Sequence, residues 1–309
     1  FYLEGMKDWQ AEKRESAVLS FERAAKTSPS IDLYWRETAQ AGIQQVTDLV
    51  QNSDLPQDQK SKLIQTAINN AVNAAKQATE TNPKSAYNWA SRGYIYQSLI
   101  GAVQGADQWA VDAYEQATKY SPYNPSYPTQ AGISLLKKAA SLAETAAAEK
   151  QEILEKARLY FEKSIEIKPD YAPAHFQMAK IYFDQKKDSE MIDSLEKAKQ
   201  AAPNDVGLAF QLGLVYYQRQ QYQKARAEFE RAVYFNPNYS NALYFLGLAC
   251  DSLGEKNLAI ALMERTLQLN PGHETVAKIL NNLKAGKKAL SGIQEENPPV
   301  APIEDENPQ

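Results

Sequence analysis

Apolar residues recur at helical spacing along most of the chain, and the pattern of apolar and polar positions itself repeats. In residues 206–235 the apolar side chains fall at i, i+3, i+4 and i+7, which predicts amphipathic helices rather than strands. Pro169, Pro203, Pro237 and Pro271 interrupt the pattern at intervals of 34 residues. Because a proline cannot continue a helix, each interval predicts two helices that end before the proline.

Small and large residues hold set places within this unit. Gly213, Ala225 and Ala232 are small enough to let two helices approach closely, and Tyr216 and Phe229 are large enough to fill the space between them. A single pair of helices cannot bury its apolar face alone, so we expect consecutive pairs to stack.

Residues 206–239 resemble the tetratricopeptide repeat, a helix–turn–helix unit of 34 residues. The consensus positions are occupied by Leu212, Gly213, Tyr216, Ala225, Phe229, Ala232 and Pro237. The resemblance implies an all-α fold, a right-handed α-solenoid of about seven helical hairpins, the first of them partial, with a C-terminal capping helix and a disordered tail.

The first half of the chain keeps the helical signature but loses the regular period. The prolines that follow the second-helix pattern here are Pro29, Pro83, Pro122 and Pro169, and their intervals of 54, 39 and 47 residues exceed 34 by 20, 5 and 13. Residues 54–60 predict a loop between two lengthened helices, and the 13-residue excess is rich in helix formers, so we expect it to lengthen helices as well.

These patterns divide the chain into four parts. Residues 1–168 are expected to form irregular hairpins with lengthened helices, and 169–271 three regular repeats. Residues 272–290 are expected to form the capping helix. Residues 291–309 are acidic and rich in proline, which predicts a disordered tail.

The segment 98–110, "SLIGAVQGADQWA", interrupts one hairpin. Gly101 and Gly105 predict a tight turn. The apolar Ile100, Val103 and Trp109 could make this segment a docking loop or a hydrophobic plug tucked against the next repeat, and we favour the plug.

Charge excludes one class of partner. The formal net charge is −4, and the tail alone carries five carboxylates without a Lys or Arg, which leaves residues 1–290 near +1 (−4 plus 5). Such a balance is not the basic footprint of a nucleic-acid-binding protein. No run of 18 apolar residues is present, so this segment is not expected to insert into a membrane.

The residues that usually carry chemistry are sparse. The chain has two histidines, His175 and His273, in different repeats, and one cysteine, Cys250, which we expect to be a small buried residue. There is no metal-ligand spacing and no glycine-rich phosphate loop. We therefore predict no catalytic residue, no metal site and no cofactor.

The resemblance implies a binding surface, because the first helices of tetratricopeptide repeats line a concave groove. Many of the residues at groove positions are aromatic, which favours contact with an extended peptide or a partner subunit, although some could instead pack between adjacent first helices. Carried over by position, the groove residues are Tyr87, Tyr94, Phe176, Lys180, Phe183, Phe210, Leu214, Tyr217, Tyr244 and Leu248.

A second resemblance covers residues 31–135. The run "NWASRGYIYQSLIGAVQGADQWAVDAYEQATKYSPYNPSYPTQAG", with "LYWRETAQAGIQQ" before it, resembles the repeat region of bacterial O-antigen ligase-like membrane proteins. The chain also begins at Phe1 inside helix-like sequence, which we interpret as a truncated or processed product.

Three functions remain open at this point. The first, which we favour, is a non-enzymatic scaffold that binds a peptide or partner subunit in an aromatic-rich groove. The second is the extramembrane domain of a polytopic cell-envelope protein, extracytoplasmic and tethered through a missing N-terminal part; otherwise a cytoplasmic location is expected. The third is a structural subunit that assembles with its own copies into a homo-oligomer.

Overall fold

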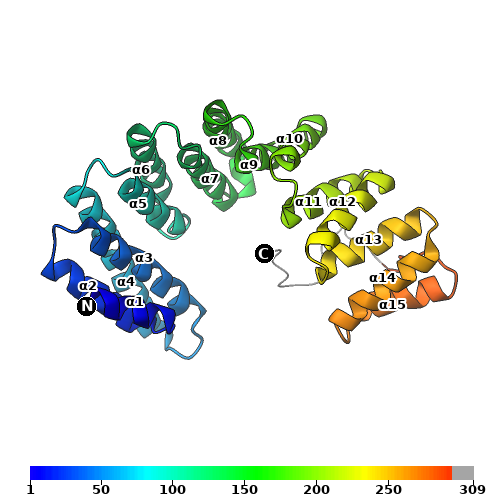
Figure 1. Ribbon diagram of the computed structural model, residues 1–309, viewed down its shortest axis with the longest axis horizontal. Helices are drawn as coiled ribbons and strands as arrows, with labels where there is room; N and C mark the ends of the chain where they lie inside the picture. Colours follow the sequence, from blue (N-terminus) through cyan, green and yellow to red (C-terminus); the bar gives the residue numbers. More distant parts are fainter. Residues whose placement is uncertain (294–309) are drawn as a thin grey trace. The chain divides into compact units, whose positions relative to one another are not determined.

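The chain folds into consecutive pairs of helices, as a computed structural model of residues 1–293 shows (Figure 1). The described part contains fifteen α-helices, one 3-10 turn and no strand. The all-α prediction of stacked hairpins is therefore confirmed. The helices form two compact units, which divide between Pro169 and Asp170. The predicted disordered tail lies outside the described residues from 294 onward.

Unit 1 contains four hairpins. They are α1 (Tyr2–Gln10) with α2 (Arg14–Thr27), α3 (Asp32–Gln51) with α4 (Gln57–Thr81), α5 (Ala86–Ser98) with α6 (Ala106–Tyr120), and α7 (Ser126–Ser141) with α8 (Ala147–Ile167). The 3-10 turn Glu144–Ala146 precedes α8.

Unit 2 contains three hairpins and a final helix. They are α9 (Ala172–Asp184) with α10 (Asp188–Ala201), α11 (Val206–Gln218) with α12 (Tyr222–Phe235), and α13 (Ser240–Ser252) with α14 (Lys256–Leu269), followed by α15 (Glu274–Lys284). α15 buries Val276, Ile279, Leu280 and Leu283.

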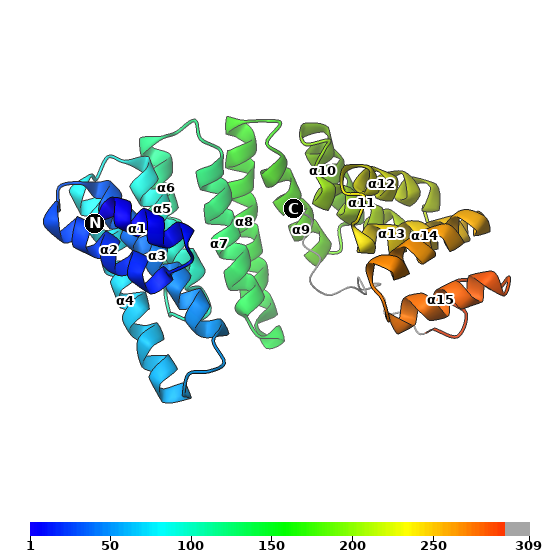
Figure 2. The ribbon, with the colours of Figure 1, turned by 60° about the horizontal axis from the view of Figure 1, so that its bottom comes forward.

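The predicted lengthening of helices in the first half is confirmed. α3 and α4 have 20 and 25 residues, and α7 and α8 have 16 and 21, whereas the helices of the three regular hairpins have 13 or 14. One end of α4 reaches further down than α2 in the view of Figure 2. The loop after α3 lies at 52–56 rather than 54–60, because α4 already begins at Gln57, directly after Pro56.

A glycine on the first helix meets a large side chain of the second in most hairpins. A Cβ on Gly93 would lie 2.9 Å from the ring of Tyr114, one on Gly132 2.5 Å from Phe161, and one on Gly213 2.6 Å from Phe229. Gly5 with Phe21 and Gly247 with Met263 repeat the arrangement. Any larger residue would push the hairpin apart, so these glycines set the distance between its helices.

Two tryptophans pin the start of a first helix to the loop before it. Trp35 Nε1 donates to the carbonyl oxygen of Pro29 at 3.0 Å, and Trp89 Nε1 donates to that of Pro83 at 2.7 Å. Each donor lies six residues after its proline, a spacing that is visible in the sequence. These bonds fix the entry of the chain into α3 and α5.

The turn between α5 and α6 is made by two glycines in the left-handed region. Gly101 has φ +92° and Gly105 has φ +82°, so the predicted tight turn is confirmed. Ile100 and Val103 pack against a core of α3, α4, α5 and α6, which includes Ile43. The turn is therefore a plug, but it covers the preceding hairpin rather than the next one.

Candidate binding surface of unit 2

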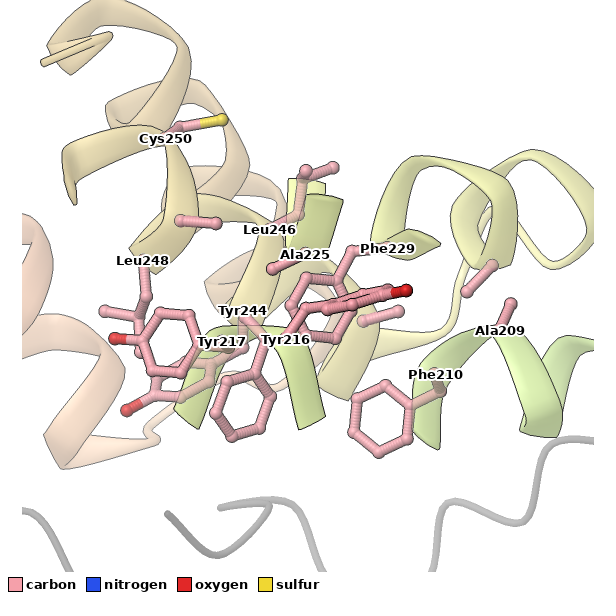
Figure 3. Close-up of a cluster of buried hydrophobic side chains, with 14 of the residues drawn as sticks. Ala209, Phe210, Tyr216, Tyr217, Ala225, Phe229, Tyr244, Leu246, Leu248 and Cys250 are labelled. Atoms are coloured by element: carbon pink, nitrogen blue, oxygen red, sulfur yellow. The ribbon is translucent and has the colours of Figure 1, made fainter. Parts of the chain in front are cut away.

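Phe245 on α13 is the centre of an aromatic cluster that joins two hairpins. Its fully buried ring lies 5.9 Å from Phe210 and 5.7 Å from Tyr217, both on α11, and 5.8 Å from Phe229 on α12. Tyr244 adds an edge-on contact at 5.1 Å. Figure 3 shows Phe210, Tyr217, Phe229 and Tyr244 within this cluster of side chains, with Cys250 apart from them. The packed rings of this cluster hold α11 and α13 rigidly side by side.

The predicted groove residues of unit 2 differ widely in exposure. Four of them are buried and pack within the helical array instead of facing solvent: Phe210, Tyr217, Tyr244 and Leu248. Phe176 and Leu214 are half-buried, and Lys180 and Phe183 are exposed. The accessible part of the surface therefore lies on α9 and the adjoining side of α11.

Tyr87 and Tyr94 lie on α5 in unit 1 and are exposed. The guanidinium of Arg36 lies 4.4 Å from the centre of the Tyr87 ring. These two tyrosines thus belong to a surface of unit 1, separate from the aromatic cluster of unit 2.

α13 is closed on its groove side as well as its core side, because every residue from Ser240 to Asp251 is buried. The chain after α15 contributes to this cover. Ala289 N donates to Asp251 Oδ2 at 2.9 Å, and Leu290 and Ile293 pack against the core of unit 2. The capping helix predicted over 272–290 ends at Lys284, and the residues after it return to α13 instead. The apolar spacing in "ALSGI" was the available signal.

A side chain of α15 holds this returning segment. Asn282 Nδ2 donates to the carbonyl oxygens of Ala289 at 3.0 Å and Ser291 at 2.8 Å. Lys288 Nζ adds a bond to the carbonyl oxygen of Asp251 at 3.4 Å. Residues 285–293, which we call the return segment, are therefore anchored to both α13 and α15.

The α9 end of the surface is positively charged. Lys180 Nζ lies 4.8 Å from the centre of the Phe176 ring, and burial lowers the pKa of Lys180. Lys186 and Lys187 follow at the end of the helix, and Lys187 Nζ lies 6.0 Å from the Tyr182 ring. The side chains of all three lysines are exposed.

Asn88 on α5 connects three helices of unit 1. The side chain is fully buried, and its Nδ2 donates to Asp32 Oδ2 at 2.7 Å and to the carbonyl oxygen of Ala78 at 3.0 Å. Arg36 donates to its Oδ1 at 3.0 Å. Burial opposes ionisation of Asp32, but hydrogen bonds from Asn88 and Asn82 outweigh it and lower the Asp32 pKa.

Cys250 and His175 lie buried among the helices, whereas His273 is partly exposed. Cys250 is fully buried, and burial raises the pKa of its thiol to about 12, so little thiolate forms at neutral pH. His175 is also buried. Over the described residues no group of His, Cys, Asp and Glu side chains could hold a metal ion. Nor is any helix among residues 1–293 both long and apolar enough to cross a membrane.

Comparison with solved structures finds a similar fold. PilF of Pseudomonas aeruginosa matches with 16% identity and a TM-score of 0.51, over 82% of this chain and 99% of that one. YrrB, described as a TPR protein with an unusual peptide-binding site, has 16% identity and a TM-score of 0.48, over 67% and 97%. MamA of Desulfovibrio magneticus RS-1 has 19% identity and a TM-score of 0.43, over 60% and 94%.

Comparison by sequence reaches the repeats of unit 2. No curated protein matches the chain. Family models described as tetratricopeptide repeat match residues 172–205 and residues 210–274. These ranges contain α9 to α14, the three hairpins of regular length. Residues 172–205 and 210–274 are therefore tetratricopeptide repeats.

Proposed function

We propose that this protein is a non-enzymatic interaction scaffold that binds an extended peptide, or an extended segment of a partner subunit, on the first helices of unit 2. Proteins built from tetratricopeptide repeats generally act as interaction modules. The observation that carries the proposal is the open end of the surface on α9. There Phe183 is 55% exposed, beside the half-buried Phe176 and the cation of Lys180.

The chemistry of this surface fits a peptide. Exposed aromatic rings on a rigid support are typical anchors for a partner because they bury large apolar areas and lose little side-chain freedom. The buried cluster around Phe245 holds α11 and α13 in place before binding. An extended ligand would then bear most of the ordering cost, and the scaffold little.

The test uses peptides selected from a random library against the full chain, followed by titration by calorimetry. We expect Phe183→Ala to weaken binding at least tenfold, since a central aromatic anchor is commonly worth more than 1 kcal/mol. Tyr234→Ala is the matched control, because Tyr234 is an aromatic on α12 with 78% exposure that lies outside the groove positions. Equal weakening by both variants, or no selected peptide at all, would contradict the proposal.

The two alternative functions, self-assembly and a place in the cell envelope, predict different measurements. A self-assembling subunit would show a mass that rises with concentration in light scattering, and a monomer at all concentrations would exclude it. The envelope function rests on the resemblance of residues 31–135 and stays a prediction. Cell fractionation with an antibody to the 291–309 tail tests it, because a membrane-bound species much heavier than 34.6 kDa is expected.

A further inference from the structure

We propose that unit 1 carries a second binding site, a cleft between α4, α5 and α6, for a partner peptide in which a carboxylate side chain stands next to an aromatic one. The cleft has a volume of about 360 Å³. This lies at the lower end of the roughly 300–1,000 Å³ that is usual for ligand sites, so it admits one or two side chains. The lining residues that carry the proposal are Lys76, Trp89, Arg92, Tyr96, Trp109 and Asp112.

The cleft lies on the side of α5 away from the predicted groove. Tyr87 and Tyr94, seven residues apart on α5, are the groove residues of this helix. Trp89 and Tyr96 have the same spacing but follow those tyrosines by two residues, which rotates them by about 200° around the helix. They therefore face the second helices α4 and α6, which complete the cleft.

Trp109 gives the cleft an aromatic face. Its side chain is 46% exposed, and its ring lies 5.5 Å from the buried ring of Tyr96. A Cβ on Gly105 would lie 3.5 Å from the indole, so the turn before α6 also supports it. An indole that is supported by packing yet nearly half exposed is a typical anchor for an aromatic partner group.

Arg92 supplies an oriented positive charge in the cleft. Its Nε donates to Tyr96 Oη at 3.1 Å, and its Nη1 donates to Thr79 Oγ1 at 3.0 Å. The guanidinium also lies 5.4 Å from the ring centres of Trp89 and Tyr96. These neutral partners fix its direction without cancelling its charge. A guanidinium held in this way is well suited to a carboxylate, which forms stronger hydrogen bonds with it than a neutral acceptor does.

The charges around the cleft give the ligand a direction. Lys76 on α4 adds a second cation, and its exposed ion pair with Glu80 at 3.8 Å is of a kind that contributes little. Asp112 on α6 repels a carboxylate from the opposite wall. A ligand carboxylate is therefore expected beside Lys76 and Arg92, with its neutral ring against Trp109.

Two other ligand classes fit this cleft less well. An organic cation, which aromatic rings commonly attract, would meet the positive charge of Arg92. A small free acid would stay partly in water, because Lys76, Trp109 and Asp112 are exposed, whereas tight small-molecule sites enclose most of their ligand. A peptide continues beyond the cleft along α4 and α6 and makes further contacts there.

The experiment follows the indole N–H signals of the full chain by NMR, because all four tryptophans, Trp9, Trp35, Trp89 and Trp109, lie in unit 1. The probe is the capped hexapeptide Gly-Ser-Glu-Phe-Gly-Ser. We expect it to shift the Trp89 and Trp109 signals and to leave that of Trp9 in place. A probe with Gln instead of Glu should bind roughly tenfold more weakly, because it lacks the charge-assisted hydrogen bond. Added salt should reduce this difference.

Substitutions in the chain test the two halves of the cleft separately. Lys76→Gln should weaken binding of the Glu probe about threefold, since it removes one of two cations. Lys62→Gln, at another exposed position of α4, is the matched control and should bind like the unmodified chain. Trp109→Ala, followed through the Trp89 signal, should lose most of the binding, whereas Trp109→Phe should keep most of it. Melting temperatures of all variants show whether each one is folded.

Several outcomes would overturn the proposal. Equal affinities of the Glu and Gln probes, equal effects of Lys76→Gln and Lys62→Gln, or no shift of the Trp109 signal at millimolar peptide would each do so. If phenylacetate, which has the ring and the carboxylate but no peptide chain, binds as tightly as the hexapeptide, the ligand is a small acid and the peptide assignment is wrong. Phe183→Ala should leave the titration unchanged, because this cleft is independent of the surface on α9.

Discussion

Phe210 and Phe183 are both predicted groove residues, yet only Phe183 faces solvent. Phe210 lies within 6 Å of the rings of Phe229, Tyr239 and Phe245, so the next hairpin uses it for packing. Phe183 lies at the end of α9 and remains more than half exposed. A groove position predicted from the repeat pattern therefore does not fix the exposure of its side chain. The exposure depends on whether neighbouring side chains pack against it.

This difference predicts opposite effects of the same substitution. Phe210→Ala should lower the free energy of unfolding by about 3 kcal/mol or more, because it leaves a cavity in the aromatic cluster. Phe183→Ala should change it by no more than about 0.5 kcal/mol, as is usual for an exposed site. Urea unfolding followed by circular dichroism measures both. Similar losses for the two variants would contradict the assignment of Phe183 to an open surface.

Helices of unit 1 are held at their ends by polar contacts as well as by the core between them. Asn88 of α5 reaches the last turn of α4 through the Ala78 carbonyl and the first turn of α3 through Asp32. Trp35 and Trp89 anchor the same helices to the preceding loops. Such contacts matter most for the lengthened helices, because they hold the end of α4 beside the starts of α3 and α5.

Removal of Asn88 should therefore weaken unit 1 in a pH-dependent way. Asn88→Ala removes the side-chain hydrogen bonds to Asp32, to the Ala78 carbonyl oxygen and from Arg36, and is expected to cost about 2 kcal/mol at neutral pH. Asp32 has a lowered pKa in the fold, so its share of the stability is present above its ordinary pKa and is lost as pH falls through the folded pKa.

The measurement compares unfolding of the unmodified and Asn88→Ala chains between pH 7 and pH 3. We expect the difference in unfolding free energy to narrow as pH falls below the ordinary pKa of Asp32 towards its lowered pKa in the fold, because the unmodified chain loses this contribution over that range. A gap that is constant over this range would show that the hydrogen bond to Asp32 contributes nothing. Asn69→Ala, an exposed position of α4, serves as the control.

At the scale of the whole molecule, each hairpin is stabilised mainly by packing against the hairpins next to it in sequence. Within unit 1 each hairpin packs on the next, through the pairs α2 with α3, α4 with α5, and α6 with α7. In unit 2 the same holds for α10 with α11, α12 with α13, and α14 with α15. An array of this kind behaves as a sum of repeat stabilities and interface energies, so damage to one repeat need not spread far.

This organisation predicts local unfolding in a terminal repeat. Phe21→Ala removes a buried ring that packs on Gly5 and belongs to the core of α1 and α2. Amide hydrogen exchange should accelerate in α1, α2 and the adjacent part of α3, and should stay unchanged in α7 and α8. Mass spectrometry of peptic fragments resolves these regions, and a uniform increase along unit 1 would contradict the neighbour description.

Much of the fold could be predicted from the sequence, because its signals are local. The spacing of Pro203 and Pro237 marks the ends of helices, and Gly213 with Phe229 marks a close approach inside a hairpin. The groove was harder to predict. Its closure over α13 depends on Asp251 meeting Ala289, 38 residues later, and no periodic pattern links two such positions.

The length of α3 and α4 has a practical consequence for engineering. Their extra turns place the loop at 52–56 at the tip of a helical pair, where Lys60 caps the end of α3 by donating to the carbonyl oxygens of Val50 and Asn52. A fluorophore or an affinity tag inserted into this loop would be held by two helices at a distance from the hairpin cores. A repeat can thus be lengthened along its helix axes without a change in how it stacks. The extended ends of α3 and α4 therefore offer a site at which the protein can be labelled, immobilised or pulled.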